Sequence, residues 1–271
     1  MIGTVRLVLT ILGASLSLVV LLPAYLAARL FSGRAAIRIA MIWHRIVLWI
    51  TGTRVIVSGA PSRDRPLLLL ANHVSWLDIV VLAGTLPVSF VAKKEVAGWP
   101  VFSWLARLQR TIFVDRERRH AAGAASDQVA RRMAAGEIIV LFAEGTSSDG
   151  LRVLPFRSAL VGAAQRAVDG EAMSTLQPLA IVYRRIHGLP LGRRERARIA
   201  WYGGMDLLPH MAGLLREGGV DVHMAFAPAL QLGRNGDRKA LTARAGAAVE
   251  ALASDLNRGC EPRNLAQKEL T

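Results

Sequence analysis

The first apolar stretch of the chain is long enough to reach across a membrane. No charged residue occurs from Leu7 to Ala28, and a helix of that length covers roughly 33 Å. A cleavable signal peptide is the alternative, because Arg6 precedes an apolar run that ends in alanines. Tyr25 and Leu26, however, occupy positions where a cleavage site needs small residues. We therefore expect a helix that spans the bilayer or anchors deeply in it.

A second apolar stretch follows, from Ile37 to Ile50, and it carries Arg38 and Arg45 seven residues apart. This spacing places both arginines on nearly the same side of a helix. The stretch is too short and too charged to span a bilayer alone. We expect it to lie in the head-group layer or to pack back against the first helix, with an ordinary core helix as the alternative. Residues 1–52 are thus predicted to form a membrane-associated segment of two helices.

Short apolar runs then alternate with helical stretches. The expected strands are residues 55–57, 67–70, 89–91, 111–114, 138–142, 179–182, 199–202 and 220–226. The expected helices are residues 77–86, 102–108, 119–134, 159–168 and 238–256. Near-continuous apolar strands are typical of sheets buried on both faces, and their alternation with helices favours parallel pairing. The sequence therefore predicts an α/β fold over residues 53–271, with a mostly parallel sheet covered by helices.

Charge narrows the possible partners. The chain has 34 basic and 20 acidic residues among 271, a formal net charge of +14, which favours an anionic partner unless it reflects only an arginine-rich composition. The basic residues are scattered and not interleaved with stacking aromatics, so we expect no nucleic-acid partner. Arg29, Arg34 and Arg38 follow the first helix and favour a cytoplasmic catalytic body at the inner membrane. The single cysteine, Cys260, excludes an intramolecular disulfide and a cysteine-based zinc site.

The first candidate for chemistry is the segment NHVSWLD, residues 72–78. His73 directly follows a buried-type strand, and open α/β sheets place their ligand crevice at the carboxyl ends of strands. Asp78 lies in the first turn of the next expected helix, from which it could hydrogen-bond one ring nitrogen and leave the other free to take a proton. The alternative is a loop histidine beside a helix-capping aspartate.

Two further strand ends carry polar groups. FAEGTSSDG, residues 142–150, places Glu144 after another apolar strand, where the alternative is a Gly-rich turn that caps the next element. FVDR, residues 113–116, ends a third strand with Arg116, whose guanidinium suits phosphate, although it could equally be a solvated surface arginine. Together, the three strand ends predict one active-site crevice.

These motifs resemble those of the glycerolipid acyltransferases related to 1-acylglycerol-3-phosphate acyltransferase. Residues 72–78 are similar to the family's N-H-x4-D block, residues 113–116 to its second block, residues 142–146 to its F-P-E-G-T block, and residues 178–182 to its proline-containing fourth strand. The resemblance implies a one-step transfer with no acyl-enzyme, in which the donor is acyl-CoA or acyl carrier protein. It implies no cofactor and no metal.

The resemblance also implies residue roles. His73 would be the general base on the acceptor hydroxyl and Asp78 would orient it. Arg116 would contact the acceptor's phosphate, and Glu144, Gly145 and Thr146 would shape the acceptor site. The acceptor would be a lysolipid, with 1-acylglycerol-3-phosphate giving phosphatidic acid, and the amphiphilic substrates would explain the contact with membrane lipid.

One departure from the family pattern affects the acceptor. Ser147 replaces the arginine that usually follows E-G-T in the family and helps to bind phosphate. The form TSSDG resembles that of members that acylate lyso-ornithine lipid, an aminolipid without phosphate, which is the alternative acceptor. Arg152 or Arg157 could instead supply the missing guanidinium. A second departure, Ala143 in place of proline, implies only a small loss of loop rigidity.

Two other classes of protein remain as alternatives. A lipid hydrolase would use Ser75 or Ser147 with His73, but the sequence contains no G-x-S-x-G elbow. A non-catalytic protein that binds membrane surfaces fits the charge and the apolar N-terminal region. It does not explain why His73, Glu144 and Arg116 each follow a strand.

Overall fold

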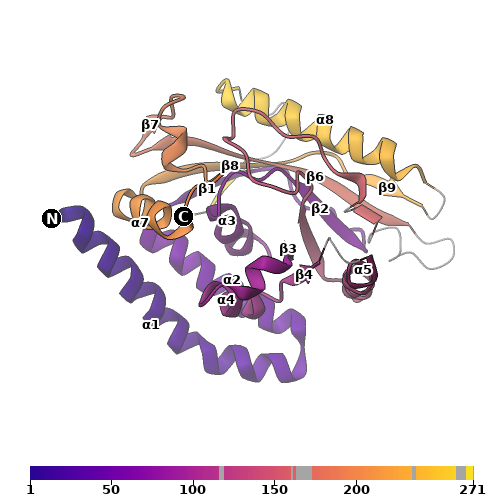
Figure 1. Ribbon diagram of the computed structural model, residues 1–271, viewed down its shortest axis with the longest axis horizontal. Coiled ribbons are helices and arrows are strands. Elements are labelled where there is room, and N and C mark those ends of the chain that lie inside the picture. The colour runs from indigo at the N-terminus through magenta and orange to yellow at the C-terminus, as the bar shows by residue number, and fades with distance from the viewer. Residues whose placement is uncertain (116–118, 160, 163–172, 234–235, 261–266, 271) are drawn as a thin grey trace.

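The computed structural model describes the chain except for residues 116–118, 160, 163–172, 234–235, 261–266 and 271. In this part of the chain, one mixed β-sheet lies between two layers of helices (Figure 1). The strands are β1 (Arg54–Ser58), β2 (Leu67–Ala71), β3 (Val88–Lys93), β4 (Ile112–Val114), β5 (Ile138–Phe142), β6 (Ser174–Ile186), β7 (Leu189–Pro190), β8 (Val220–Phe226), β9 (Leu230–Leu232) and β10 (Gln267–Leu270).

The centre of the sheet is parallel. The strand order is β10-β1-β8-β6-β2-β5-β3-β4, with β7 and β9 paired to β6. Strand β2 pairs in parallel with both β5 and β6, and β3 pairs in parallel with β5 and β4. Strands β1 and β8 are parallel to each other, but β8 runs antiparallel to β6. The predicted α/β fold with a mostly parallel sheet is therefore confirmed, with a reversed edge on one side.

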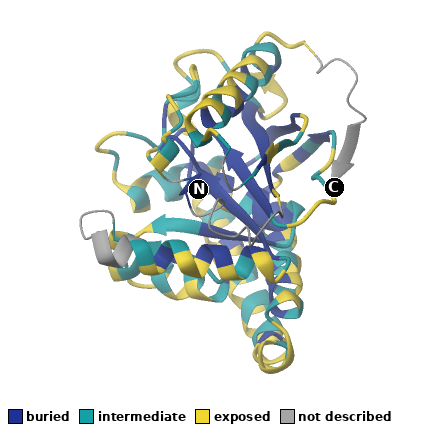
Figure 2. Ribbon diagram, turned by 90° about the vertical axis from the view of Figure 1, so that its right-hand side faces the viewer, coloured by how far each residue is buried: buried dark blue, intermediate teal, exposed yellow. Residues whose placement is uncertain are grey.

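Each face of the sheet is covered by helices. The helical elements are α1 (Ile2–Phe31), α2 (Gly33–Thr51), α3 (Leu77–Thr85), η1 (Lys94–Gly98), α4 (Phe102–Leu108), α5 (Arg119–Ala134), η2 (Arg196–Arg198), α7 (Leu207–Glu217) and α8 (Arg238–Asn257). Leu48 of α2, Val81 of α3 and Leu214 of α7 pack in the core on one face. Met133 of α5 and Val249 of α8 pack on the other. Figure 2 shows the strands buried and the outer helical surfaces exposed.

Helices α1 and α2 form a hairpin that packs against the body. Ser32 ends α1 and caps α2, because its hydroxyl accepts a hydrogen bond from Ala35 N at 3.4 Å. Trp43 Nε1 of α2 donates to Ala14 O of α1 at 3.0 Å, which joins the two helices. Arg6 Nη2 donates to Thr51 O at 2.9 Å, which joins the start of α1 to the end of α2. The packing of the second stretch on the first is therefore confirmed, and the alternative of a core helix also holds in part, because α2 packs on α3 and contributes Leu48 to the core.

The outer face of α1 has no protein cover. The helix is long and apolar enough to cross a membrane by length and composition, and only 6% of its most apolar window is buried. The exposed large apolar side chains of α1 beyond residue 2 are Val5, Val8, Leu9, Ile11, Leu12, Leu16, Val19, Val20, Leu26, Leu30 and Phe31. An apolar face of this length indicates association with a membrane.

Three sequence-based expectations differ from the structure or fall outside it. Residues 199–202 were expected as a strand, but Ile199 and Ala200 follow η2 and are buried by packing, and Trp201 N donates to Val74 O at 2.9 Å. Helix α7 was not predicted, since Pro209 breaks its pattern, although a proline is tolerated in a first turn. The helix expected over residues 159–168 lies largely outside the described residues.

Candidate active site

Two of the three predicted strand ends meet at one edge of the sheet. Strands β2 and β5 are direct neighbours, with Ala71 opposite Phe142, so the residues that follow them emerge side by side. The imidazole of His73 stacks on the ring of Phe142, with ring centroids 4.0 Å apart and an interplanar angle of 16°. The predicted proximity of His73 and Glu144 is therefore confirmed at the level of the strands that carry them.

His73 and Asp78 form a hydrogen-bonded pair. The Nδ1 atom of His73 lies 2.7 Å from Asp78 Oδ2. The Asp78 side chain is fully buried, whereas the His73 side chain keeps 16% of its surface exposed. Because the carboxylate accepts this bond, Nδ1 carries the proton and Nε2 is left as an acceptor. Within the described residues Nε2 has no hydrogen-bonding partner, so it is available to take a proton from a bound hydroxyl.

The Asp78 carboxylate is held by further donors. Its Oδ2 accepts the backbone N–H of Val74 at 2.7 Å and of Ser75 at 3.0 Å. Its Oδ1 accepts the hydroxyl of Tyr183 at 2.6 Å. Sequence reasoning missed Tyr183, because a tyrosine within an apolar strand reads as a core residue. With these bonds the buried carboxylate is satisfied and fixed in orientation.

The side chain of Asn72 holds the neighbouring strand β6 in place. Its Nδ2 donates to Ile181 O at 2.9 Å, and its Oδ1 accepts from Ile181 N at 2.8 Å. These bonds continue the β2–β6 pairing one step past Ala71, where the chain turns out of the sheet. The asparagine of the motif therefore has a structural role beside the dyad.

Glu144 is buried in the turn that follows β5. Its Oε1 accepts the backbone N–H of Leu154 at 3.2 Å, and only 1% of the residue is exposed. Burial raises the pKa of Glu144 from 4.5 to about 8; backbone amides of Leu154 and His73 oppose the rise, and the charge of Asp78 adds to it. At neutral pH the carboxyl group is therefore mostly protonated.

The rest of the turn encloses the histidine loop. Gly145 adopts a φ of +74°, which favours glycine, and its N–H donates to Phe142 O at 3.1 Å. Ser148 N donates to His73 O at 2.9 Å, whereas Thr146 is exposed and Ser147 half-buried. The structure thus places the turn that carries Glu144, Gly145 and Thr146 against the His73 loop, and the roles of these residues toward the acceptor stay predictions.

We expect Glu144→Gln to change how stability depends on pH. Between pH 4.5 and about 8 the unfolded chain loses a proton that the native carboxyl group keeps, so the native protein loses stability as pH rises. Glutamine can keep the bond from Leu154 without this penalty. Between pH 5 and 8, the unfolding free energy of the variant should fall less than that of the wild type, by about 2 to 4 kcal/mol. Denaturant titrations at both pH values measure it, with Glu250→Gln on the exposed face of α8 as the control; equal pH dependence would contradict the expectation.

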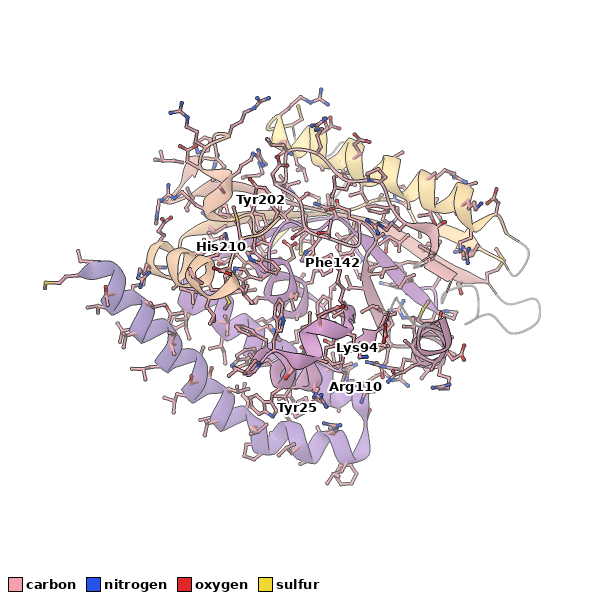
Figure 3. The ribbon with its side chains drawn as sticks, viewed as in Figure 1. Tyr25, Lys94, Arg110, Phe142, Tyr202 and His210 are labelled. Atoms are coloured by element: carbon pink, nitrogen blue, oxygen red, sulfur yellow. The ribbon has the colours of Figure 1, made fainter. Side chains whose placement is uncertain are left out.

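The arginines that the sequence analysis assigned to the acceptor's phosphate are either outside the described residues or exposed. Arg116 lies outside the described residues. Strand β4, which precedes it, is the third strand from β2, about 14 Å away across the sheet. Lys94 Nζ contacts Asp115 Oδ2 at 3.0 Å near that edge (Figure 3). Arg152 and Arg157 are exposed, and their use toward a phosphate stays a prediction.

The structure also bears on the alternative chemistries. Ser75 is fully buried, and its hydroxyl accepts from Leu77 N at 3.4 Å, so it is not exposed to attack a substrate. Among the described residues, no group of three or more histidine, cysteine or acidic side chains could hold a metal ion.

The chain is similar to known proteins over most of its length. The family described as Acyltransferase matches residues 54–195. Lyso-ornithine lipid O-acyltransferase of Brucella abortus is 46% identical over 244 residues, which are 89% of this chain and 91% of that protein. The protein of the same name from Rhizobium meliloti is 46% identical, over 80% of this chain and 75% of that one.

The sequence similarity to proteins named 1-acyl-sn-glycerol-3-phosphate acyltransferase covers a shorter part of the chain. A 1-acyl-sn-glycerol-3-phosphate acyltransferase of Neisseria gonorrhoeae is 36% identical over 116 residues, which are 42% of this chain and 44% of that protein. The crystal structure of the 1-acyl-sn-glycerophosphate acyltransferase from Thermotoga maritima has the same fold. It superposes with a TM-score of 0.65 at 18% identity and covers 94% of this chain and 95% of that one.

Proposed function

Since the chain belongs to the Acyltransferase family, we propose that it acylates the hydroxyl of lyso-ornithine lipid at a membrane surface. That it is an acyltransferase follows from the family itself. The observation that supports lyso-ornithine lipid as the acceptor is the 46% identity to a lyso-ornithine lipid O-acyltransferase over 89% of the chain. The sequence match to a 1-acyl-sn-glycerol-3-phosphate acyltransferase covers only 42% of it.

The turn after β5 supports this acceptor. Ser147 stands where the glycerophosphate branch, by the resemblance, presents an arginine to the phosphate. A missing arginine removes a charge-assisted contact worth about 1.5–3 kcal/mol to a phosphomonoester. An aminolipid without phosphate does not need that contact. The alternative acceptor, 1-acylglycerol-3-phosphate, would have to find its guanidinium elsewhere.

The dyad provides the chemistry of the transfer. His73 Nε2 takes the proton of the acceptor hydroxyl as the oxygen attacks the carbonyl carbon of an acyl thioester. The C–S bond then breaks, and the imidazolium returns the proton to the thiolate. Asp78 holds the ring in the tautomer this requires and stabilises the imidazolium. A thioester is already activated, so general-base help of about 10²–10⁴ is enough without an acyl-enzyme. We propose acyl-CoA or acyl carrier protein as the donor.

The hairpin supports a one-sided mode of membrane attachment. Helix α1 packs along α2 and reaches α7 at its start, where Gly3 approaches Arg216. A helix held to the body at its first turn and again by Tyr25, which donates to Leu108 O at 2.5 Å, cannot have its two ends on opposite sides of a bilayer. We propose that α1 lies in one leaflet with its exposed apolar face inward, and that the body faces the cytoplasm at the inner membrane.

The acceptor is tested by the ratio of kcat/KM values on lyso-ornithine lipid and 1-acylglycerol-3-phosphate. We expect the wild type to prefer lyso-ornithine lipid, and Ser147→Arg to move the ratio toward the phosphate acceptor by up to about tenfold. Gln128→Arg is the control, because it adds the same charge on the exposed side of α5. A wild type that acylates only 1-acylglycerol-3-phosphate would overturn the assignment of the acceptor.

A further inference from the structure

Tyr183 is the one buried tyrosine that reaches the catalytic pair. It lies on β6, with 3% of its surface exposed, just before an irregularity in the pairing with β8. Its hydroxyl donates to Asp78 Oδ1 at 2.6 Å, while the three other donors to this carboxylate, from His73, Val74 and Ser75, all bind Oδ2. Among the described residues, Tyr183 is thus the only hydrogen-bond partner of Oδ1.

We propose that Tyr183 is a positioning residue for acyl transfer, which extends the His73–Asp78 pair to a Tyr183–Asp78–His73 relay. This inference rests on the proposed use of His73 as the general base. Tyr183 does not touch the acceptor. It fixes the rotation of the carboxylate and balances its charge, and through the carboxylate it sets how readily the imidazole takes a proton.

The pairing of β6 with β2 fixes the position of the Tyr183 phenol. The side chain of Asn72 brackets Ile181 with two hydrogen bonds, and Ile181 lies two residues before Tyr183 on the same strand. The register of β6 against β2 is therefore fixed where the phenol needs it, since a slip by one residue would turn Tyr183 to the other face of the sheet. Asp78, in the first turn of α3, meets the phenol from the same face.

Tyr183 is suited to donate and unsuited to act as a base. Burial raises the pKa of Tyr183 well above 10.0, and the charge of Asp78 and the hydrogen bond to it raise it further. The phenol therefore keeps its proton across the working range of the enzyme. A permanent donor stabilises the charged form of the carboxylate at every pH at which the enzyme works.

Removal of the Tyr183 hydroxyl should shift the proton affinity of the His73–Asp78 pair in a definite direction. A buried carboxylate that loses a hydrogen bond to its charged form holds a proton more tightly. In the active form, Nδ1 of His73 keeps the proton that it donates to Asp78, and Nε2 carries none. A carboxylate that lacks the bond from Tyr183 stabilises the imidazolium more strongly, so the proton on Nε2 becomes harder to remove. The form with a free Nε2 then appears only at higher pH.

The other titratable and charged groups near the pair do not depend on the phenol oxygen for their hydrogen bonds. They come from each surrounding element: Glu144 after β5, Asp149 in the turn that follows, Arg196 of η2, and His210 of α7, which accepts the indole N–H of Trp76 at 3.2 Å. None of them receives a hydrogen bond from Tyr183 in the structure. A shift in the pH profile of a Tyr183 variant therefore reports on the bond to Asp78.

The test compares Tyr183→Phe with Tyr25→Phe. Tyr25 is also buried and also donates a hydrogen bond, to Leu108 O, but it lies in the N-terminal hairpin, apart from Phe142 and the site (Figure 3). For Tyr183→Phe we expect kcat to fall about tenfold, with KM within about twofold. We expect the acidic limb of the kcat/KM profile to move up by roughly 0.5–1 pH unit. Tyr25→Phe should change neither.

A direct titration separates this proposal from the proposed function. The chain has only six histidines, so selective labelling lets the ring signals of His73 be followed by NMR without any substrate. An upward shift of that titration in Tyr183→Phe supports the relay, and an unchanged titration with an unchanged acidic limb overturns it. A wild type that acylates no lysolipid would refute the proposed function and leave the titration as the test of Tyr183.

A second measurement guards against a variant that fails to fold. The chain has three tyrosines, Tyr25, Tyr183 and Tyr202, so 3-fluorotyrosine can be confined to residue 183 in a Tyr25→Phe, Tyr202→Phe background. Fluorination makes the phenol a stronger donor with little change in shape. The acidic limb should then move to lower pH, opposite to the phenylalanine variant. A purely structural role for Tyr183 predicts no movement in either direction.

Discussion

Substitution of His73 by alanine should lower kcat for acyl transfer by about 10³-fold or more while the protein stays folded. The substitution removes the imidazole whose Nε2 is the proposed general base, and general-base help is worth about 10²–10⁴. The fold should tolerate the loss. The contact of the loop with the following turn is made by the backbone oxygen of His73, and Asp78 keeps its bonds from Val74, Ser75 and Tyr183.

The measurement is a single-turnover assay with a radiolabelled acyl thioester, together with thermal unfolding. His187→Asn is the matched control, because His187 is exposed in the β6–β7 hairpin and its φ of +52° is one that asparagine accepts. Asp78→Asn should lose both activity and stability, since an amide oxygen cannot serve the donors that two carboxylate oxygens serve. A His73→Ala protein that keeps its activity would contradict the proposed role of His73 as the general base.

The second large effect concerns the membrane. Leu12→Glu together with Leu16→Glu should lower the partition coefficient onto lipid vesicles by at least about 100-fold. Each substitution removes an apolar side chain worth about 1.5–3 kcal/mol on burial and adds a charge that the bilayer disfavours. Both leucines are at least 60% exposed, so the fold should be unaffected.

Vesicle flotation measures this change, and activity should fall on bilayer substrates but not on monomeric short-chain ones. The control adds the same two charges elsewhere, as Ala243→Glu with Ala247→Glu on the exposed side of α8, and should bind vesicles like the wild type. Equal flotation of both double variants would show that α1 does not anchor the chain. Substitution is a sharper test than deletion, because removal of the hairpin also uncovers α3 and α7, against which α2 and α1 pack.

The sequence predicts the parts of the site that depend on strand ends. His73 and Glu144 each follow an apolar run, and parallel neighbours bring such residues to the same edge. Strand order is not visible in one sequence, so nothing there separates β5, which adjoins β2, from β4, which lies at the sheet edge.

Residues that act from inside the core are harder to predict. Tyr183 has the apolar surroundings of any buried strand residue, and only the register of β6 shows that its hydroxyl reaches Asp78. Ile199 and Ala200 look like a strand because they are buried, but packing and not pairing buries them. The pattern of apolar residues in a short segment indicates that the segment is buried. It does not indicate which other segment buries it, because that depends on the whole fold.

The docking of α1 also constrains how the chain folds during synthesis. The first turn of α1 packs against α7, and Gly3 and Arg216 are 213 residues apart along the chain. Translation at about 5–20 residues per second separates the emergence of these two segments by roughly 10 to 40 s. Strand β1 waits roughly 8 to 33 s for β8, its parallel neighbour in the sheet, because Arg54 pairs with Asp221, 167 residues further along the chain. Throughout that interval α1 can pack against α2 but not against α7, and its outer apolar face is exposed. Capture of the nascent chain by a bilayer would cover that face before the catalytic body is complete.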